Sequence, residues 1–482
     1  MKQTYMFSNK IYRFLGIGCI VLVYSACKTP ALVGKAENRS VPASFGSQKD
    51  TINAARINPK DYFPDPYLLA LIDTALKNNQ ELNVTLQEIE ISRNEIRAMK
   101  GAYLPSVGVK GAAGVEKTAR YTSTGASEKN INIAPGIETP EPLPDYLLAA
   151  YATWEVDIWH KLRNAKKAAV AKYLSTVEGK NFAVTNLVAE VANSYYELLA
   201  LDNQRDIVNN NITIQTNALE IVKLQKTAAR VTELAVRKFE AEVLNTRSLQ
   251  YGIQQRITET ENRINFLLGR YPQPIARNDH AFDSLIPVTV HAGMPSQLLE
   301  NRPDIKQAEL ELAAAKLDVK VAKAEFYPSL GISASLGYQA FKASYLIKSP
   351  ESMLYSLAGE LVAPLINRNA LKAAYYTANA KQIQAVYNYE RTVLNAYVEV
   401  ANQLSKIGNM SNLYDLKAKQ VEALTESINI SNDLFRSARA DYMEVLMTQR
   451  DALESRFELI ETKKEQMSAL VNVYRALGGG WN

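Results

Sequence analysis

Residues that could perform acid–base, nucleophilic or metal chemistry are few in this chain, and they are not grouped. The three histidines are His160, His280 and His291, and none lies in an HExxH frame, which places two imidazoles on one helix face. No GxxxxGK[ST] or GxSxG motif occurs. The many acidic residues alternate with lysine and arginine, as on solvated helix faces. The sequence therefore predicts no catalytic residue, no metal site, no cofactor and no enzymatic activity.

One cysteine stands where a covalent modification is expected. Three basic residues precede the apolar run 14–24, which is too short to span a membrane but suits the core of a signal peptide. The run ends in Ser25-Ala26-Cys27, which resembles the lipobox of bacterial lipoproteins, where cleavage leaves the cysteine to carry lipid. The only other cysteine, Cys19, would leave with the signal peptide. We therefore predict lipidation of Cys27; the alternative is an ordinary signal peptide cleaved elsewhere, with a spare thiol.

The charge balance gives no reason to expect a nucleic-acid partner. The 482 residues include 55 basic and 50 acidic side chains, a formal net charge of +5. Residues 1–26 hold three of the basic residues and no acid, so their removal leaves 52 minus 50, or +2. The mean hydropathy of −0.19 excludes a bundle of many transmembrane helices.

The chain is a tandem duplication. Residues 78–108 (NNQELNVTLQEIEISRNEIRAMKGAYLPSVG) align without a gap with residues 301–331 (NRPDIKQAELELAAAKLDVKVAKAEFYPSLG), at an offset of 223 (301 minus 78). Leu268-Gly269 likewise matches Leu477-Gly478, at an offset of 209. Each half therefore spans more than 200 residues and repeats one structural pattern.

Long helices are predicted in both halves. No proline occurs in residues 145–271 or 365–482, and glycine is sparse there. Proline and glycine cost about 3 and 1 kcal/mol in a helix interior, so their absence from Ala-, Leu-, Glu-, Lys- and Gln-rich sequence favours helix. After a strand-like start, each stretch predicts an antiparallel pair of helices of about 50 residues each. The turns are expected near 227–233 and 436–442.

Strands are predicted between the helical regions, where apolar residues alternate with small or polar ones. Residues 330–339 (LGISASLGYQ) show this period of two clearly. The predicted strands are about 103–115, 146–158, 328–342 and 352–363. Pro105, Pro328 and Pro364 are predicted to mark the switches between helix and strand.

Topology decides how such strands could lie in a membrane. A soluble sandwich and a transmembrane barrel both produce this alternation. Four strands cannot close a barrel, and an open sheet edge is not tolerated in lipid. If the strands span a membrane, several chains must share one barrel, and three chains give twelve strands. A coiled-coil or surface adhesin would account for the helices but not for the strands or the lipobox.

Four stretches resemble the TolC superfamily of outer-membrane factors, specifically the NodT-type lipoproteins of drug and metal efflux. They are residues 65–82, 294–305 (MPSQLLENRPDI), 326–329 (FYPS) and 474–481 (YRALGGGW). The resemblance implies a mainly α fold with a small β part. Long hairpins would form a trimeric periplasmic α-barrel, and four strands per protomer would contribute to a 12-stranded outer-membrane β-barrel.

The same resemblance implies a passive exit duct for small toxic compounds or drugs in a tripartite efflux system. The implied partners are two further copies of the chain, outer-membrane lipid, a periplasmic adaptor (membrane fusion protein) and an inner-membrane RND pump. The implied location is the outer membrane of a Gram-negative cell, with a lipid anchor and an extension into the periplasm. Exit ducts for type I protein secretion or for metal efflux share this architecture and remain alternatives.

The expected boundaries follow from these observations. They are a lipoprotein signal peptide at 1–26, an extended N-terminal segment at 27–66, a first repeat at 67–270, an equatorial connector at 271–293 and a second repeat at 294–482.

The periplasmic tip is where the resemblance implies a gate. Residues 231–233 and 440–446 resemble the family's tip segments, and Glu444 lies where the family places one ring of acids. Met447 stands at the next expected acid position, and Phe435 replaces the family's tip tyrosine.

A set of charged residues near the two turns could latch the closed tip. Arg436 and Arg439 lie close enough in sequence to pair with Glu233 or Asp441. With Glu444, these residues form the predicted gate. Exposed ion pairs contribute only about 0.2–1 kcal/mol each, so threefold repetition would matter. The alternative is an exposed turn with incidental charges.

Overall fold

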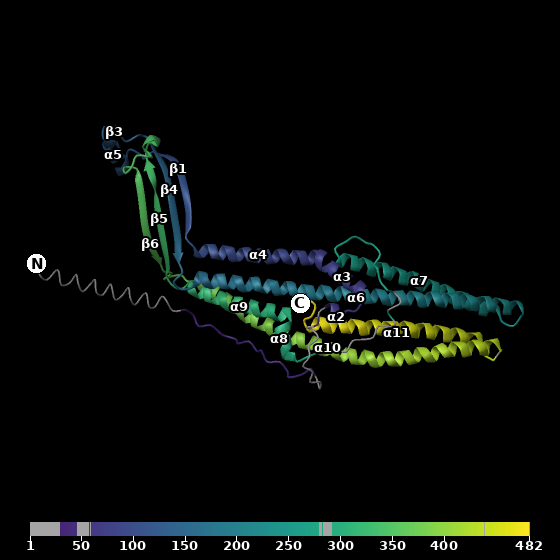
Figure 1. The fold of residues 1–482 in the computed structure, drawn as a ribbon. Helices are drawn as coiled ribbons and strands as arrows, with labels where there is room; N and C mark the ends of the chain where they lie inside the picture. The colour runs from purple at the N-terminus through teal and green to yellow at the C-terminus, as the bar shows by residue number, and fades with distance from the viewer. Residues whose placement is uncertain are drawn as a thin grey trace. The chain divides into compact units, whose positions relative to one another are not determined.

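The computed structural model describes residues 29–45, 57, 59–278, 282, 292–437 and 439–481. They are mainly helical with a small β part, as Figure 1 shows. The described residues belong to two compact units: the first includes residues 90–174 and 310–386, and the second includes 175–309 and 387–481. The signal peptide and Cys27 lie outside the described residues. In the described part of the chain, no helix has the length and apolar character needed to span a membrane.

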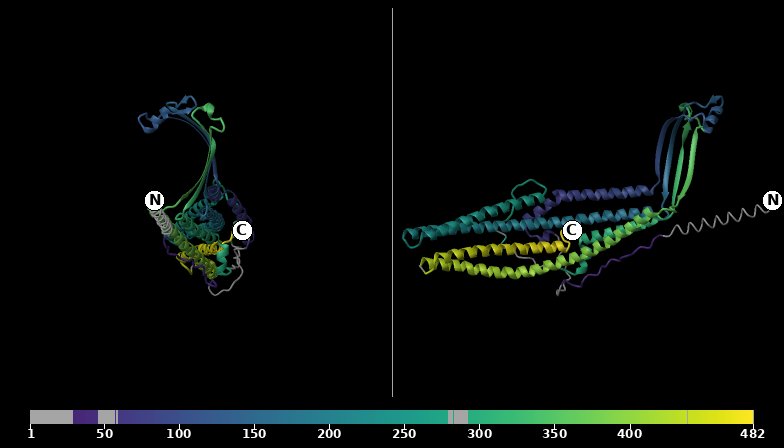
Figure 2. Two further views of the ribbon diagram at one scale, coloured as in Figure 1. Left: turned by 90° about the vertical axis from the view of Figure 1, so that its left-hand side faces the viewer. Right: turned by 180° about the vertical axis from the view of Figure 1, so that it is seen from behind.

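The first unit contains a four-stranded antiparallel sheet in the order β1-β4-β5-β6. Figure 2 shows the four strands lying side by side in one curved sheet. Every strand end lies within three residues of the range expected from the period-two pattern. The strands are β1 (Ser106–Glu116), β4 (Leu143–Val156), β5 (Ser329–Ala340) and β6 (Met353–Val362).

The connections at the far end of the sheet carry small elements that the sequence did not reveal. Between β1 and β4 lie α5 (Ser123–Asn130) and a short hairpin of β2 (Asn132–Ala134) and β3 (Ile137–Glu138). The β5–β6 connection contains the 3-10 turn η4 (Ala343–Tyr345).

Each half contributes one very long helix and one of about half its length. In the first half, α6 (Lys161–Thr227) has 67 residues and α7 (Glu233–Leu267) has 35. In the second half, α10 (Asn369–Arg436) has 68 residues and α11 (Tyr442–Ala476) has 35. The turns lie where they were predicted, but the expectation of two equal helices of about 50 residues is wrong.

The reason for the unequal lengths is that a second helix begins where each shorter one ends. In the first half, α3 (Pro66–Asn78) and α4 (Gln80–Tyr103) adjoin the end of α7, where Asn79 Nδ2 donates to Leu267 O at 2.9 Å. Gly269 adopts φ +65°, and a Cβ there would lie 2.3 Å from a backbone oxygen of α3. Glycine is therefore required at this junction.

The second half repeats this junction. Its corresponding helices are α8 (Leu298–Asn301), preceded by the 3-10 turn η3 (Pro295–Gln297), and α9 (Pro303–Ala324). Gly478 adopts φ +90°, and a Cβ there would lie 2.7 Å from the Asn301 oxygen. Gly269 and Gly478 are the pair matched by the duplication, so the repeat explains why α7 and α11 both end at such a glycine.

Buried tyrosines fasten residues 59–66 to the long helices of the second unit. The short helix α2 (Pro59–Tyr62) ends at Tyr62, whose ring stacks on Tyr474 at a centroid distance of 4.2 Å. The Tyr62 hydroxyl donates to Leu470 O at 2.8 Å, and Tyr195 donates to the Asp65 carboxylate at 2.7 Å. Burial and this bond to a carboxylate raise the pKa of Tyr195. These contacts join segments that lie far apart in the sequence.

Candidate functional site

The sheet has one strongly apolar face. The register pairs Val107 with Ala152, Ala152 with Ala334, and Ala334 with Leu357, so these side chains share a face. On this face Leu357 is 80% exposed, Tyr355 77% and Val107 74%. A row of exposed large apolar side chains marks a surface that another apolar phase or protein covers.

The opposite face carries mostly polar or small side chains, as the alternation predicted. Ser335 Oγ lies 2.8 Å from Ser356 Oγ, and Gln339 Nε2 donates to the Asp145 carboxylate at 2.9 Å. The Tyr151 side chain covers Gly108, where a Cβ would lie 2.6 Å from the ring. One face therefore suits lipid and the other suits water, which is the two-sided pattern of a pore wall.

The predicted helix–strand switches lie between helices and strands. Pro105 lies between α4 and β1, Pro328 between α9 and β5, and Pro364 between β6 and α10. Trp159 reinforces one switch, because its ring stacks on Tyr327 at 4.9 Å and its Nε1 donates to Pro328 O at 2.7 Å.

The start of α6 is capped by a buried carboxylate. Asp157 accepts hydrogen bonds from the Leu162 and Arg163 backbone nitrogens at 3.0 and 2.9 Å. Its side chain is only 1% exposed and lies 3.8 Å from the Arg163 guanidinium. A carboxylate at a helix N-terminus satisfies free N–H groups, so this residue fixes where the long helix begins.

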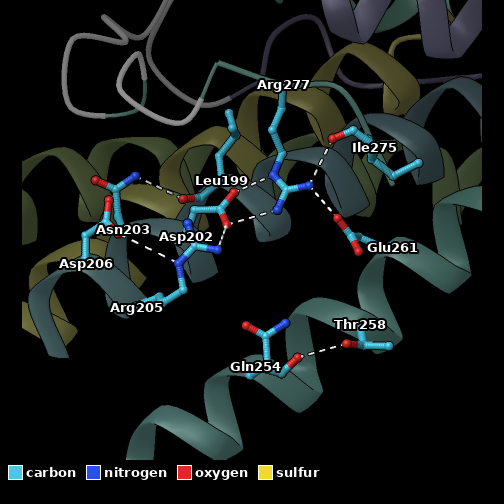
Figure 3. Close-up of polar contacts among 10 residues, drawn as sticks. All are labelled: Leu199, Asp202, Asn203, Arg205, Asp206, Gln254, Thr258, Glu261, Ile275 and Arg277. Carbon is cyan, nitrogen blue, oxygen red and sulfur yellow. Dashed lines mark hydrogen bonds and ion pairs between the residues drawn. The ribbon is translucent and has the colours of Figure 1, made fainter. Parts of the chain in front are cut away.

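Residues 271–278, the described part of the predicted equatorial connector, are held by a partly buried ion network, drawn in Figure 3. Arg277 Nη2 donates to the Asp202 carboxylate of α6 at 3.0 Å, and Arg277 Nη1 pairs with Glu261 of α7. Arg205 adds a contact to Asp202 at 3.3 Å. Burial lowers the pKa of Arg277, but the bonds to Asp202 and Glu261 outweigh it, and the net shift is upward. The connector is thereby fixed to both helices of the first hairpin.

A second network surrounds a buried arginine of the MPSQLLENRPDI motif. Arg302, whose side chain is 5% exposed, binds Asp304 at 2.6 Å and Glu399 of α10 at 2.8 Å. Arg302 also donates to Ala476 O at the end of α11, at 2.7 Å. The motif therefore ties both helices of the second hairpin to the start of α9. The sequence reasoning missed both networks, because the contacts that close them join residues far apart in the chain: Arg277 and Asp202 are 75 residues apart, and Arg302 and Ala476 are 174 apart.

The two hairpin turns have the same local construction. Arg230 N donates to Gln225 O at 2.9 Å, and Arg439 N donates to Leu434 O at 2.8 Å, at equivalent places in the repeat. Ala229 at the first turn has φ +56°. Equal turns in the two halves agree with the duplication.

The predicted gate residue Glu233 forms ion pairs only within its own hairpin among the described residues. It is the first residue of α7, and its carboxylate contacts Lys226 across the turn and Arg237 one helical turn later, the latter at 2.9 Å. The hydrogen bond from Lys226 lowers the pKa of Glu233, and the Arg237 charge adds to this effect.

The other predicted gate residues are exposed at the second turn. Arg436 ends α10 and lies 3.8 Å from Asp433, and Arg439 follows in the turn. Asp441 is the N-cap of α11, without a side-chain cap bond, and Glu444 lies in the first turn of that helix. Within the described residues, no ion pair joins either arginine to the acids expected to pair with it.

An apolar cluster connects the two hairpins near their turns. It contains Leu219 and Val222 of α6, Phe239 and Val243 of α7, and Leu446 of α11. The half-buried Phe435 and Tyr442 pack against it. The sequence reasoning did not identify this cluster, although residues 236, 239 and 243 follow the three–four spacing of a helix seam.

The described residues contain no group of three or more His, Cys, Asp and Glu side chains that could hold a metal ion. The family model "Outer membrane efflux protein" matches residues 71–270 and 294–479, which covers both repeats. The chain belongs to this family.

Similar proteins span almost the whole chain. The pyoverdine export outer membrane protein OpmQ of Pseudomonas aeruginosa is 27% identical over 470 residues, covering 95% of this chain and 96% of OpmQ. The cation efflux system protein CusC of Escherichia coli is 26% identical over 482 residues, covering 96% and 98%. The MtrE outer-membrane channel of Neisseria gonorrhoeae, solved in its open state, has a TM-score of 0.82 at 22% identity, covering 94% and 99%. The chain thus has the fold of TolC-family channels and is an outer-membrane efflux protein, a family of ducts and not of enzymes.

Proposed function

We propose that three copies of this chain form the outer-membrane exit duct of a tripartite efflux system for small toxic compounds or drugs. The observation that carries the proposal is the family match over both repeats, together with a sheet that is apolar on one face and polar on the other. A periplasmic adaptor and an inner-membrane pump would deliver the compounds. Lipidation of Cys27 would tether each subunit to the membrane.

The sheet itself argues for several copies in one barrel. Its outer strands, β1 and β6, each have one neighbour, which leaves two edges with free backbone N–H and C=O groups. Such edges are not tolerated in lipid. Because the strands alternate in direction across the sheet, β6 of one copy can pair antiparallel with β1 of the next. Three copies then give a closed barrel of twelve strands.

The duplication predicts the matching helix contact between copies. In one chain, α9 packs on α6, where Lys172 Nζ and Asp318 Oδ2 are 3.0 Å apart. The equivalent of α9 in the first repeat is α4, which is far more exposed: Ile91 is 60% exposed, whereas its counterpart Ala314 is 1% exposed. A neighbouring copy of α10 would cover α4 as α6 covers α9.

This correspondence names an ion pair between subunits. Subtracting 223 from Asp318 gives Glu95 on α4, and adding 209 to Lys172 gives Lys381 on α10. Both side chains are exposed in one chain. We therefore propose that Glu95 of one copy lies beside Lys381 of the next.

The charged tip residues remain candidates for a latch between subunits. Arg439, Asp441 and Glu444 are exposed, and no salt bridge is found for them among the described residues. Charges at the ends of the hairpins are free to meet the same charges of neighbouring copies, where threefold repetition multiplies a small effect.

The test combines oligomeric mass with conductance. The detergent-extracted protein should have the mass of a trimer, and it should form pores in planar bilayers. Glu95→Lys or Lys381→Glu alone should weaken the trimer, because each places like charges together, and the double variant should restore it. A water-soluble monomer without conductance would overturn the proposed duct. A trimer unaffected by the single variants would overturn only the predicted ion pair.

A further inference from the structure

The helix ends that adjoin the sheet are strongly basic. Residues 97–105, 157–168, 319–328 and 363–375 cover the ends of α4, α6, α9 and α10 next to the strands. Together they hold ten lysine and arginine residues and only two acids, a surplus of eight positive charges per chain. One of the two acids, Asp157, is buried as the cap of α6. We call these four ranges the basic collar.

Among the described residues, several lysines of the collar pair with no carboxylate. Lys100, Lys167, Lys323 and Lys372 are exposed, one on each of the four helices. No ion pair joins any of them to an acid in the part of the chain that the structure describes. What distinguishes the collar is the concentration of such lysines on four neighbouring helix ends, since elsewhere lysines lie among acids, as Lys226 does beside Glu233. A surface that keeps this much uncompensated charge favours an anionic partner.

Exposed apolar side chains lie between the sheet and the collar. Ile366 is 90% exposed, Leu365 52%, Leu104 50%, Ile158 46% and Trp159 45%. All five belong to the short connectors that join strands to helices. From the sheet outward, the order is an apolar face, then a band containing tryptophan and aliphatic side chains, then lysine and arginine. A bilayer presents the same order as hydrocarbon, interface and phosphate.

We propose that the basic collar binds the phosphate groups of anionic phospholipids in the membrane leaflet next to the helices. The inference rests on the proposed function, because it requires the sheet to lie in a membrane. Lysine and arginine near a membrane surface attract anionic lipid, and their long side chains can reach headgroups from a helix end.

The short distance from the strands to the collar favours lipid headgroups as the partner. A helix rises about 1.5 Å per residue, so the collar lies within roughly 15 Å of the strand ends. The headgroup layer adds roughly 5–8 Å to each side of the hydrocarbon core, and charge interactions persist for about another 8 Å at physiological salt. The collar therefore lies within reach of lipid phosphates.

The experiment compares lipid binding by two matched triple variants of the full-length trimer. Lys100→Gln with Lys323→Gln and Lys372→Gln removes one collar charge from each of three helices. Lys77→Gln with Lys238→Gln and Lys419→Gln removes three exposed lysines outside the collar. Each protein, in mild detergent, receives equal amounts of phosphatidylglycerol and phosphatidylcholine, and native mass spectrometry counts the bound lipids. Conductance of the same preparations confirms that the channel is assembled.

The wild type and the control variant should retain phosphatidylglycerol in preference to phosphatidylcholine. The collar variant should bind phosphatidylglycerol about tenfold more weakly or worse, and about 0.5 M NaCl should remove most of the preference in the wild type. Equal retention of both lipids by a conducting wild-type trimer overturns the inference and leaves the proposed function intact. Release of the lipid by excess inorganic phosphate, or preferential capture of cell-wall fragments through the collar lysines, also overturns it. A protein that neither trimerises nor conducts contradicts the proposed function instead.

Discussion

Replacing Leu446 with alanine should open the tip more than removing any one charge there. Leu446 is 8% exposed and is the member of the apolar cluster that α11 contributes against Phe239 and Val243. Truncating a buried leucine to alanine costs about 2–5 kcal/mol of stability. We take about 2 kcal/mol for Leu446, the low end of this range, because it lies at the edge of the cluster. An exposed ion pair contributes about 0.2–1 kcal/mol. If opening separates the two hairpins, about 2 kcal/mol shifts the closed-to-open ratio roughly thirtyfold per subunit.

Single-channel recording in planar bilayers measures this shift directly. Leu446→Ala should raise the mean conductance or the open time well above the wild type, whereas Glu233→Gln should raise it slightly. Leu453→Ala is the matched control, because Leu453 is on the same helix, is 6% exposed and lies outside the cluster. It should lower the thermal stability without opening the channel. The reasoning fails if Leu446→Ala lowers stability but leaves conductance at the wild-type level, or if both leucine variants open the channel equally.

Three further predictions concern the tip, a repeat junction and the anchor. Because ion pairs hold the pKa of Glu233 below its usual value, they stabilise the tip above about pH 4 and are lost as pH falls below it. Conductance should therefore rise on acidification, and Glu233→Gln should reduce that rise. Gly478→Ala should destabilise the protein by about 2 kcal/mol or more in thermal unfolding, since φ is +90° and the Cβ would meet a carbonyl oxygen. Gly408→Ala, in open space within α10, should be neutral or stabilising. Cys27→Ser should abolish the acyl mass on the mature N-terminus in mass spectrometry, and an acylated variant would refute the lipobox assignment.

The strands and long helices could be predicted because their signals are local. Alternation over 330–339 defines one strand, and the lack of proline after the strand-like start of 145–271 defines a helical region. The unequal helix lengths could not be predicted, because the end of α7 is set by contact with Asn79, 188 residues away in the sequence. Gly269 was visible as part of a repeated Leu-Gly pair, but its need for φ +65° appears only when α3 lies against it.

Ion pairs likewise could be predicted from the sequence only where the two residues are close together in it. Arg237 and Glu233 are four residues apart on one helix face, so the spacing rule for helical ion pairs would have found them. The sequence reasoning instead considered arginines of the other hairpin. The Arg277–Asp202 pair lies 75 residues apart, and no local pattern signals it.

The energetics of the second unit differ between the two ends of the hairpins. At the connector end, Arg302 is buried and Arg277 is partly buried, and each pairs with two acids. Removing one partner of a fully buried pair costs about 3–5 kcal/mol, and Asp202, at 1% exposure, comes nearest to that case. At the turns, the described ion pairs are exposed and stay within one hairpin, and the apolar cluster is small. Movement at the turns therefore costs less free energy than movement at the connector. We expect that opening of the duct bends the hairpins beyond the two arginine networks, and that substitutions which change conductance concentrate between the cluster and the turns.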